Sequence, residues 1–179
     1  PHHCKTRSAG YAPSGTPHQV LAMGCTRQQL TAFLDDLLEP HRFRDYCPNG
    51  LQVEGRSDIG HLVTGVTASQ ALIDAALKRG ADAILVHHGY FWRSEDPCIV
   101  GIKAQRIRSL IANDVNLFAY HLPLDWHPQL GNNATLGRLM GLEDAHPMDP
   151  SDTDTPIFVG HFPTPVPISQ LAQVLQERL

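Results

Sequence analysis

Histidine is the residue type in this sequence with the most potential for chemistry, because the 179 residues include eleven histidines. Imidazole is the commonest metal ligand in proteins, and it also serves as a general acid or base. Two histidines are adjacent in the segment Val86-His87-His88-Gly89, and a third histidine and an acid occur in Tyr120-His121-Leu122-Pro123-Leu124-Asp125. Imidazole combined with carboxylate suits a divalent transition metal. The candidate metal ligands are therefore His87, His88, Asp125 and His121.

Strands and helices alternate around these residues. Apolar runs predict strands over Leu62–Thr67, Ala83–Val86 and Val115–Tyr120. Helical patterns lie between them, one capped by Ser69 and closed by Gly80, and one with apolar residues from Ile102 to Ile111. This alternation is typical of βαβ units and a parallel, buried sheet, so we expect an α/β fold. Parallel sheets bind ligands outside the carboxyl ends of their strands, which is where the candidate ligands occur.

Adjacent side chains on a strand point to opposite faces, so one ion could not easily bind both His87 and His88. We therefore expect two metal ions side by side, with one histidine on each and Asp125 between or beside them. His121 would complete or orient this set of ligands. The alternative is that one histidine of the pair caps the strand end and the other is merely exposed.

The rest of the chain divides into three parts. Residues 1–25 are rich in Pro, Gly, Ser and His and predict a disordered extension. Residues 26–141 form the predicted α/β metal-binding domain, which begins with a capping box of Thr26 and Gln29 and a helix that ends before Pro40. Residues 142–179 predict an acidic linker followed by the incomplete start of a second part of the fold. Because the last helical pattern reaches Leu179 without a Gly or Pro, we expect a chain truncated at its C-terminus.

Composition argues against several classes of function. The net charge of −4 does not favour binding to nucleic acid or to an anionic membrane, and the sequence has no apolar run long enough to span a bilayer. The four cysteines lack CxxC spacing, which argues against a disulfide framework and favours the reducing cytoplasm. Neither Cys47 nor Cys98 has a partner histidine nearby in the sequence that would indicate a nucleophile.

Aromatic residues flank the candidate ligands on both sides. Tyr90, Phe91 and Trp92 follow the histidine pair, and Trp126 follows Asp125. Aromatic rings offer large rigid faces, so they could stack against a planar base. The alternative is that they pack the loops against the sheet.

Several segments together resemble a known family. They are Asp45-Tyr46-Cys47-Pro48-Asn49-Gly50-Leu51-Gln52-Val53-Glu54-Gly55, Thr64-Gly65-Val66-Thr67-Ala68-Ser69, the two histidine segments above, and Leu130-Gly131-Asn132-Asn133-Ala134. From Thr26 to Leu179 the chain closely resembles the GTP cyclohydrolase type 2 homologues, also called Nif-three-like proteins, and especially bacterial members described as radiation-resistance proteins.

This resemblance implies an α/β Nif-three-like fold with a dinuclear metal centre and assembly into toroidal homohexamers. His87, His88 and Asp125 match metal ligands of the family, and His121 lies in the same motif as a candidate near the site. The family's remaining ligands, a His and a Glu, come from a segment nearer the C-terminus and have no counterpart before Leu179.

Two functions fit these observations. The first is a metal-dependent hydrolase of a nucleotide or related heterocycle, similar to a GTP cyclohydrolase. In this hydrolase, two divalent ions would lower the pKa of a bound water, and the resulting hydroxide would attack the substrate. The ions could be Zn, Fe, Mn, Ni or Co. No particular catalytic side chain is indicated. The second is a non-catalytic metal-binding ring that binds a partner, a nucleotide or damaged nucleic acid.

Overall fold

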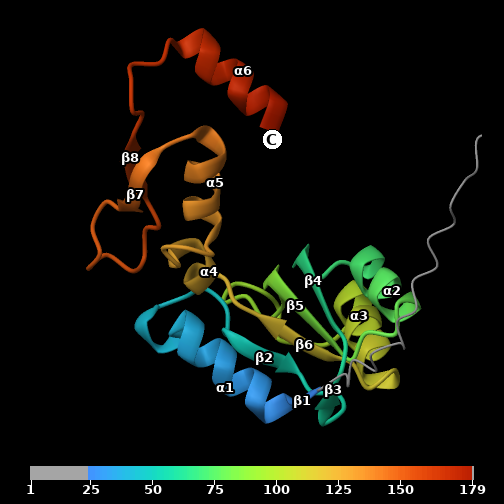
Figure 1. Cartoon of the computed structure of the whole chain (residues 1–179). Coiled ribbons are helices and arrows are strands. Elements are labelled where there is room, and N and C mark those ends of the chain that lie inside the picture. The colour runs from blue at the N-terminus through green and yellow to red at the C-terminus, as the bar shows by residue number, and fades with distance from the viewer. Residues whose placement is uncertain (1–23, 179) are drawn as a thin grey trace, which may run out of the picture.

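A four-stranded mixed sheet lies at the centre of the computed structural model, which describes residues 24–178. Its strands follow the order β2-β6-β5-β4 (Figure 1). Three of them are parallel neighbours: β4 (Leu62–Thr67), β5 (Ala83–His88) and β6 (Asn116–Ala119). The helices α2 (Gln70–Lys78) and α3 (Gly101–Ala112) connect them in turn. The predicted α/β class and its parallel βαβ core are confirmed.

The fourth strand, β2 (Gly50–Val53), was not predicted, because the sequence around Pro48, Asn49 and Gly50 indicates a loop. It pairs with β6 in the antiparallel direction, with Gly50 opposite Ala119. A four-residue strand that opens on a glycine with φ of 108° has too little pattern of its own, and pairing with β6 decides its structure. Because β2 is antiparallel, its first residue lies at the edge where β6 ends.

Helix α1 (Arg27–Leu38) has the predicted capping box. The Thr26 hydroxyl accepts a hydrogen bond from Gln29 N at 3.1 Å, and Gln29 Oε1 accepts one from Thr26 N at 2.9 Å. A single 3-10 turn, η1 (Pro40–Arg42), follows the helix. Cys25 and Thr26 also form strand β1 (Cys25–Thr26), which pairs with β3 (Asp58–Ile59). Cys25, placed in the predicted extension, is thus part of the fold, and the rest of that extension before residue 24 lies outside the described residues.

Loss of this cap should destabilise the protein by an amount that can be measured. Thr26→Ala removes the acceptor for Gln29 N, and the free energy of unfolding should fall by about 1 kcal/mol. Urea unfolding measures this change. Gln28→Ala in the same turn is the matched control, since Gln28 is exposed and makes no cap contact. Equal stability of the two variants would contradict the cap's contribution.

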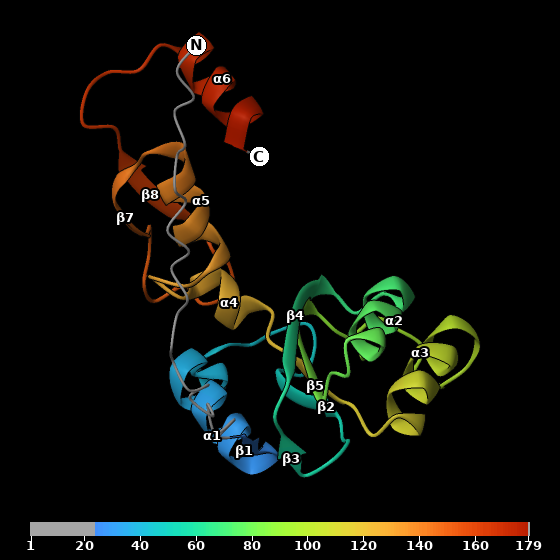
Figure 2. The same cartoon turned by 45° about the vertical axis from the view of Figure 1, so that its right-hand side comes forward.

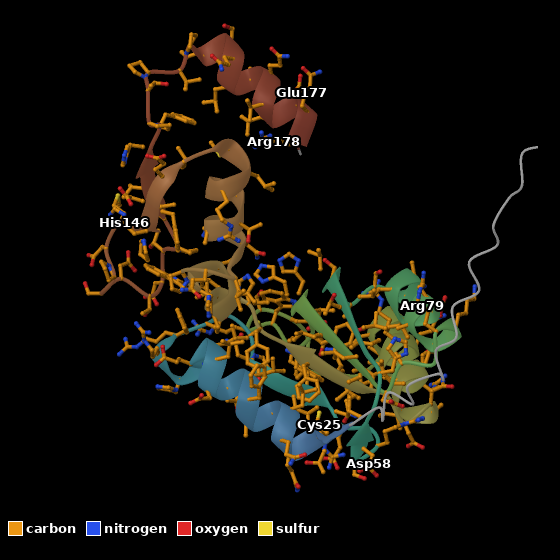
Figure 3. All side chains as sticks on the ribbon, viewed as in Figure 1. Cys25, Asp58, Arg79, His146, Glu177 and Arg178 are labelled. Carbon is orange, nitrogen blue, oxygen red and sulfur yellow. The ribbon has the colours of Figure 1, made fainter. Side chains whose placement is uncertain are left out.

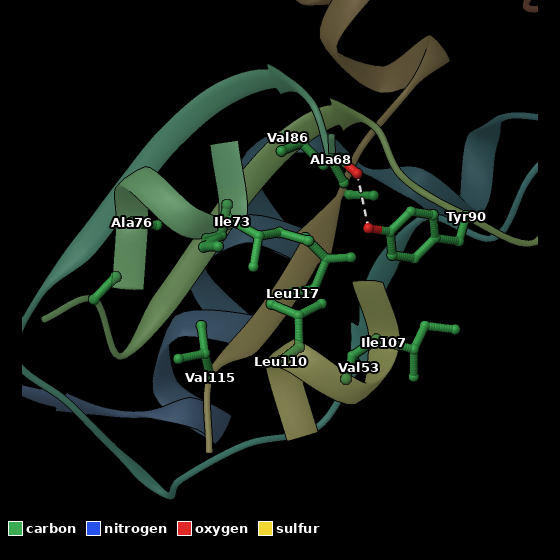
Figure 4. Close-up of a cluster of buried hydrophobic side chains, with 13 residues drawn as sticks. Val53, Ala68, Ile73, Ala76, Val86, Tyr90, Ile107, Leu110, Val115 and Leu117 are labelled. Atoms are coloured by element: carbon green, nitrogen blue, oxygen red, sulfur yellow. Dashed lines mark hydrogen bonds between the residues drawn. The ribbon is translucent and has the colours of Figure 1, made fainter. Parts of the chain in front are cut away.

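Helices cover both faces of the sheet, with α1 on one face and α2 and α3 on the other (Figures 1 and 2). Side chains alternate accordingly along β6. Leu117 and Ala119 join the buried cluster with α2 and α3, while Phe118 and Tyr120 pack with α1. Figure 4 shows the first cluster, with Tyr90 at its border. Apolar packing on both faces therefore fixes the central strands and the positions of their ends.

Starting with α4 at the edge of the four-stranded sheet, the C-terminal elements extend away from the sheet (Figures 1 and 2). They are α4 (Leu122–Trp126), α5 (Asn132–Met140), β7 (Glu143–Pro147), β8 (Phe158–His161) and α6 (Ile168–Arg178). Strands β7 and β8 form an antiparallel pair. Strand β8 and helix α6 follow the predicted linker.

Two parts of this region differ from the prediction. The predicted acidic linker contains β7, whose pairing with β8 could not be seen in its own polar sequence. Helix α4 was also missed, because it has only five residues and includes Pro123. In residues 24–178, no helix has the length and apolar character needed to cross a membrane.

Candidate metal centre

The three candidate histidines gather at one edge of the sheet. His87 and His88 end β5, and His121 follows the end of the parallel strand β6. The ring centroid of His87 lies 4.4 Å from that of His88 and 4.8 Å from that of His121. One ligand atom from each of the three lies within 4.8 Å of the others. The rule that parallel strands present their carboxyl ends together therefore located this cluster.

The rings of His87 and His88 lie side by side but are hydrogen-bonded toward opposite neighbouring strands. His88 is still paired with Thr67 of β4, whose hydroxyl lies near its ring, whereas the His87 ring contacts the Tyr120 carbonyl oxygen just after β6. The angle between the two ring planes is 44°. Both imidazoles belong to one cluster, and their assignment to two separate ions stays a prediction.

In both His87 and His88, a contact at the Nδ1 atom orients the ring. His87 Nδ1 donates to the Tyr120 carbonyl oxygen at 3.2 Å, which leaves the Nε2 lone pair of His87 free. His88 Nδ1 lies 3.1 Å from the hydroxyl of Thr67, the residue paired with it on β4. When this hydroxyl accepts the hydrogen, Nε2 of His88 is also free to bind a metal.

His121 is held by Asp45, a residue that the sequence did not single out as part of the site. His121 Nδ1 donates to Asp45 Oδ1 at 2.7 Å. The loop before β2 brings Asp45 to this edge, because β2 begins where β6 ends. A carboxylate on one ring nitrogen makes the other nitrogen a better ligand. All three histidines can therefore present Nε2.

Asp45 has its full set of hydrogen-bond donors. Its Oδ1 also accepts from Tyr46 N, and its Oδ2 accepts from Asn49 Nδ2 and Leu122 N. Burial acts to raise the pKa of Asp45, but these hydrogen bonds outweigh it and hold the pKa below its usual value. The carboxylate stays ionised and fixes His121, with no oxygen left for a metal.

Asp45→Asn should weaken metal binding without removing a ligand. An amide cannot accept the Nδ1 hydrogen as strongly as a carboxylate, so we expect roughly 10- to 100-fold lower affinity for Zn²⁺. Competition with a chromogenic chelator measures it. Asp36→Asn on the exposed side of α1 removes the same charge and should leave the affinity unchanged. Unchanged affinity in Asp45→Asn would show that Asp45 does not position His121.

Asp125 lies beside the cluster on α4. Its Oδ1 is 3.6 Å from His87 Nε2 and accepts a hydrogen bond from Asn132 Nδ2 at 2.9 Å. Asn133 Nδ2 donates to the Asp125 carbonyl oxygen. Neither asparagine caps α5, whose N-cap is Gly131, without a side-chain hydrogen bond. They instead connect α5 to the segment that holds Asp125.

The donor set fits a divalent transition metal. Three imidazole nitrogens and a nearby carboxylate are the ligands that such metals prefer. Metal binding requires neutral imidazole. Burial, followed by the neighbouring His87 and His121, lowers the pKa of His88 below 6.5, although Asp125 opposes the shift. His88 is therefore neutral at physiological pH.

Only part of the expected aromatic set lies at this centre. The Trp92 ring is 5.0 Å from that of His121 and 6.0 Å from that of His88. Tyr90 is instead buried in the core, where its hydroxyl donates to the Ala68 carbonyl oxygen at 2.7 Å (Figure 4). Trp126 is also buried and packs near Phe158. Trp92 is thus the expected aromatic residue that borders the histidines.

Cys47 lies near His121 and Asp45, a proximity that the sequence did not indicate. Burial raises the pKa of the Cys47 thiol to about 12, and the charge of Asp45 adds to this effect. The thiol is therefore protonated at neutral pH and is a poor nucleophile. Both oxygens of the Asp45 carboxylate also accept hydrogen bonds. Asp45, Cys47 and His121 therefore offer no metal site separate from the histidine cluster.

The fold and the site define a class of α/β proteins with a histidine cluster at the carboxyl edge of a mixed sheet. Within that class, residues 25–179 match the Duf34/NIF3 (NGG1p interacting factor 3) family, and the chain belongs to it. The predicted family is confirmed.

Relatives and solved structures agree with this membership. A Pasteurella multocida protein named GTP cyclohydrolase 1 type 2 homolog is 50% identical over 151 residues, 84% of this chain and 60% of that protein. A Vibrio cholerae protein of the same name is 54% identical over 144 residues, 80% of this chain and 57% of its own. The structure of protein ybgI, of unknown function, has a TM-score of 0.78 at 45% identity, covering 86% of this chain and 60% of that one.

A structure from Thermus thermophilus has a TM-score of 0.75 at 38% identity, over 85% of this chain and 60% of that one. The chain therefore spans about 60% of the length of these relatives.

Proposed function

We propose that this protein binds divalent metal and acts as a metal-dependent hydrolase on a nucleotide or related heterocycle. The observation that carries the proposal is the convergence of His87, His88 and His121, each with Nδ1 hydrogen-bonded and Nε2 available. The name shared by the relatives, GTP cyclohydrolase 1 type 2 homolog, supports a nucleotide substrate.

The side chains have distinct tasks in this proposal. His87, His88 and Asp125 bind metal, and His121 completes or orients the set, as the sequence suggested. A bound divalent metal supplies Lewis acidity and lowers the pKa of water. Asp45 and Thr67 orient imidazoles, and Asn132 orients the Asp125 carboxylate. Trp92 offers an aromatic face for a planar ring beside the histidines.

The remaining parts of the proposal rest on the family resemblance and on the sequence. We propose two divalent ions per subunit, drawn from Zn, Fe, Mn, Ni or Co, and a toroidal homohexamer, both on the family resemblance. The division into an extension (1–25), a metal-binding domain (26–141) and a further part (142–179) belongs to the proposal as well. Among residues 24–178, Cys25, Cys47 and Cys98 are free thiols, which supports the reducing cytoplasm as the location.

The test is GTP turnover that depends on metal and on the histidine cluster. The chain is stripped with a chelator, reloaded with Zn²⁺ or Mn²⁺, and incubated with GTP, whose loss is followed by chromatography. We expect turnover in the loaded protein only, and its loss in His88→Ala. The control is His146→Ala, since His146 is an exposed histidine on β7, far from the cluster (Figure 3). Full activity in a folded His88→Ala protein would refute the hydrolase.

The alternative, a non-catalytic metal-binding ring, has a different outcome in the same test. Metal would bind through the histidines, but no added nucleotide would be consumed. The net charge of −4 argues against nucleic acid as the partner of such a ring.

A further inference from the structure

An open cavity of about 550 Å³ adjoins the metal centre. The loop between α1 and β2 forms most of its wall, and Arg93 completes it. Asp45 belongs both to this wall and to the metal centre, because its carboxylate holds His121. The Asp45 side chain therefore lies between the cavity and the candidate ligand His121, and none of the candidate ligands lines the cavity.

The ionisable groups around the cavity are mainly basic. They are His41, Arg44, Asp45, Cys47 and Arg93. Arg44 is exposed, and no ion pair involves it within residues 24–178. Its neighbour Arg42, by contrast, pairs with Glu39 at 2.6 Å. An arginine that no carboxylate neutralises beside a cavity favours an anionic ligand.

Arg93 is exposed, and contacts with its neighbours hold it at the cavity. Its Nη2 donates to the Asp45 carbonyl oxygen at 2.9 Å, and its backbone N donates to the Tyr46 carbonyl oxygen at 2.7 Å. Its guanidinium also lies 5.9 Å from the centre of the Tyr46 ring. A guanidinium held by such contacts loses less conformational entropy when a ligand binds, and its remaining N–H groups can still donate.

The one carboxylate in the wall does not oppose an anion strongly. The Asp45 side chain is 2% exposed, and both of its oxygens accept hydrogen bonds from side-chain and backbone donors. Four donors therefore already stabilise its negative charge, and the two arginines outnumber it in the wall. The Cys47 thiol is neutral, for the reasons given above.

We propose that this cavity binds the phosphoryl group of a small molecule through Arg44 and Arg93. Guanidinium groups match phosphate oxygens in charge and in the geometry of their paired donors. That the same molecule also reaches the histidines, and is thus a phosphorylated substrate, rests on the proposed function. The cavity would then select phosphorylated compounds over the corresponding nucleosides.

The test measures binding of inorganic pyrophosphate to the whole chain after removal of metal, by titration calorimetry at low salt. Without metal, the histidine cluster cannot bind the probe by coordination. We expect one pyrophosphate per chain, bound at least about tenfold more weakly by Arg44→Ala and by Arg93→Ala. Arg79→Ala is the matched control, because Arg79 is an exposed arginine at the end of α2 (Figure 3).

Arg44→Ala is the decisive variant, since its side chain has no ion pair to lose within residues 24–178 and the fold should be unaffected. No pyrophosphate binding to the unchanged chain, or equal binding by Arg44→Ala, would overturn the proposal. An equal loss in Arg79→Ala would also overturn it, because the effect would then be general charge. Pyrophosphate binding without GTP turnover would support this site while refuting the proposed hydrolase.

Discussion

His88→Ala is expected to bind Zn²⁺ more than about 100-fold less tightly than the unchanged chain. Loss of a partner that only orients a ligand costs roughly 10- to 100-fold, and removal of a ligand should exceed that. His88 lies within 4.4 Å of His87 between ring centroids, and its own Nε2 is available. Competition with a chelator of known affinity measures the change.

The matched control for this prediction is again His146→Ala, an equal change outside the cluster. It should leave the affinity as it is. Circular dichroism and thermal unfolding should show His88→Ala to be folded, since the substitution removes one hydrogen bond, to Thr67. Equal affinity in the two variants would place the metal elsewhere.

Asn116→Ala is expected to have the largest effect on stability. Asn116 is a polar residue buried in the core, with no exposed surface. Its Oδ1 accepts from Gly55 N at 2.8 Å, and its Nδ2 donates to the carbonyl oxygens of Arg56 and Asp82. Each unsatisfied group costs about 1–3 kcal/mol, so the free energy of unfolding should fall by about 3 kcal/mol.

Thermal unfolding checks this prediction, with a decrease in Tm of roughly 6–12 °C expected for a chain of this size. The control is Asn113→Ala at the end of α3, where the amide donates to the Ser109 carbonyl oxygen at an exposed position. That variant should unfold within about 2 °C of the unchanged protein. A similar Tm for both variants would mean that Asn116 does not hold the segment of Gly55 and Arg56 to the sheet.

Local signals in the sequence were sufficient for much of the fold. The Thr26 capping box and the Ser69 cap are formed by residues within three positions of each other, so they can be predicted from the sequence alone. Strands β5 and β6 were predictable because they are apolar and largely buried, and β4 because of its apolar run, although none of its residues is fully buried. The rule for parallel strand ends then brought His121 to the histidine pair.

The missed features depend on contacts between distant parts of the chain. Asp45 and His121 are 76 positions apart, and only the antiparallel pairing of β2 brings them together. Asp45 occurs in a motif that supported the family resemblance, which was the available signal. Strand β7 similarly needs β8 to form.

The arrangement of the His87 and His88 rings was only partly predictable. Alternation along a strand holds where neighbouring strands keep it regular, as for Leu117 and Phe118 on β6. His88 is still paired with Thr67 of β4, while the pairing of β5 with β6 ends at Val86, and the two ring centroids lie 4.4 Å apart. Sequence spacing located these residues but did not determine how close their rings would lie.

The most direct test of the central claim is the metal content per chain by elemental analysis. The purified chain is compared with a His87→Ala/His88→Ala double variant after both are incubated with the same divalent metal and dialysed. The account predicts about one to two ions per chain in the unchanged protein and almost none in the double variant. Equal metal content in both proteins, or no metal in the unchanged chain, would contradict it.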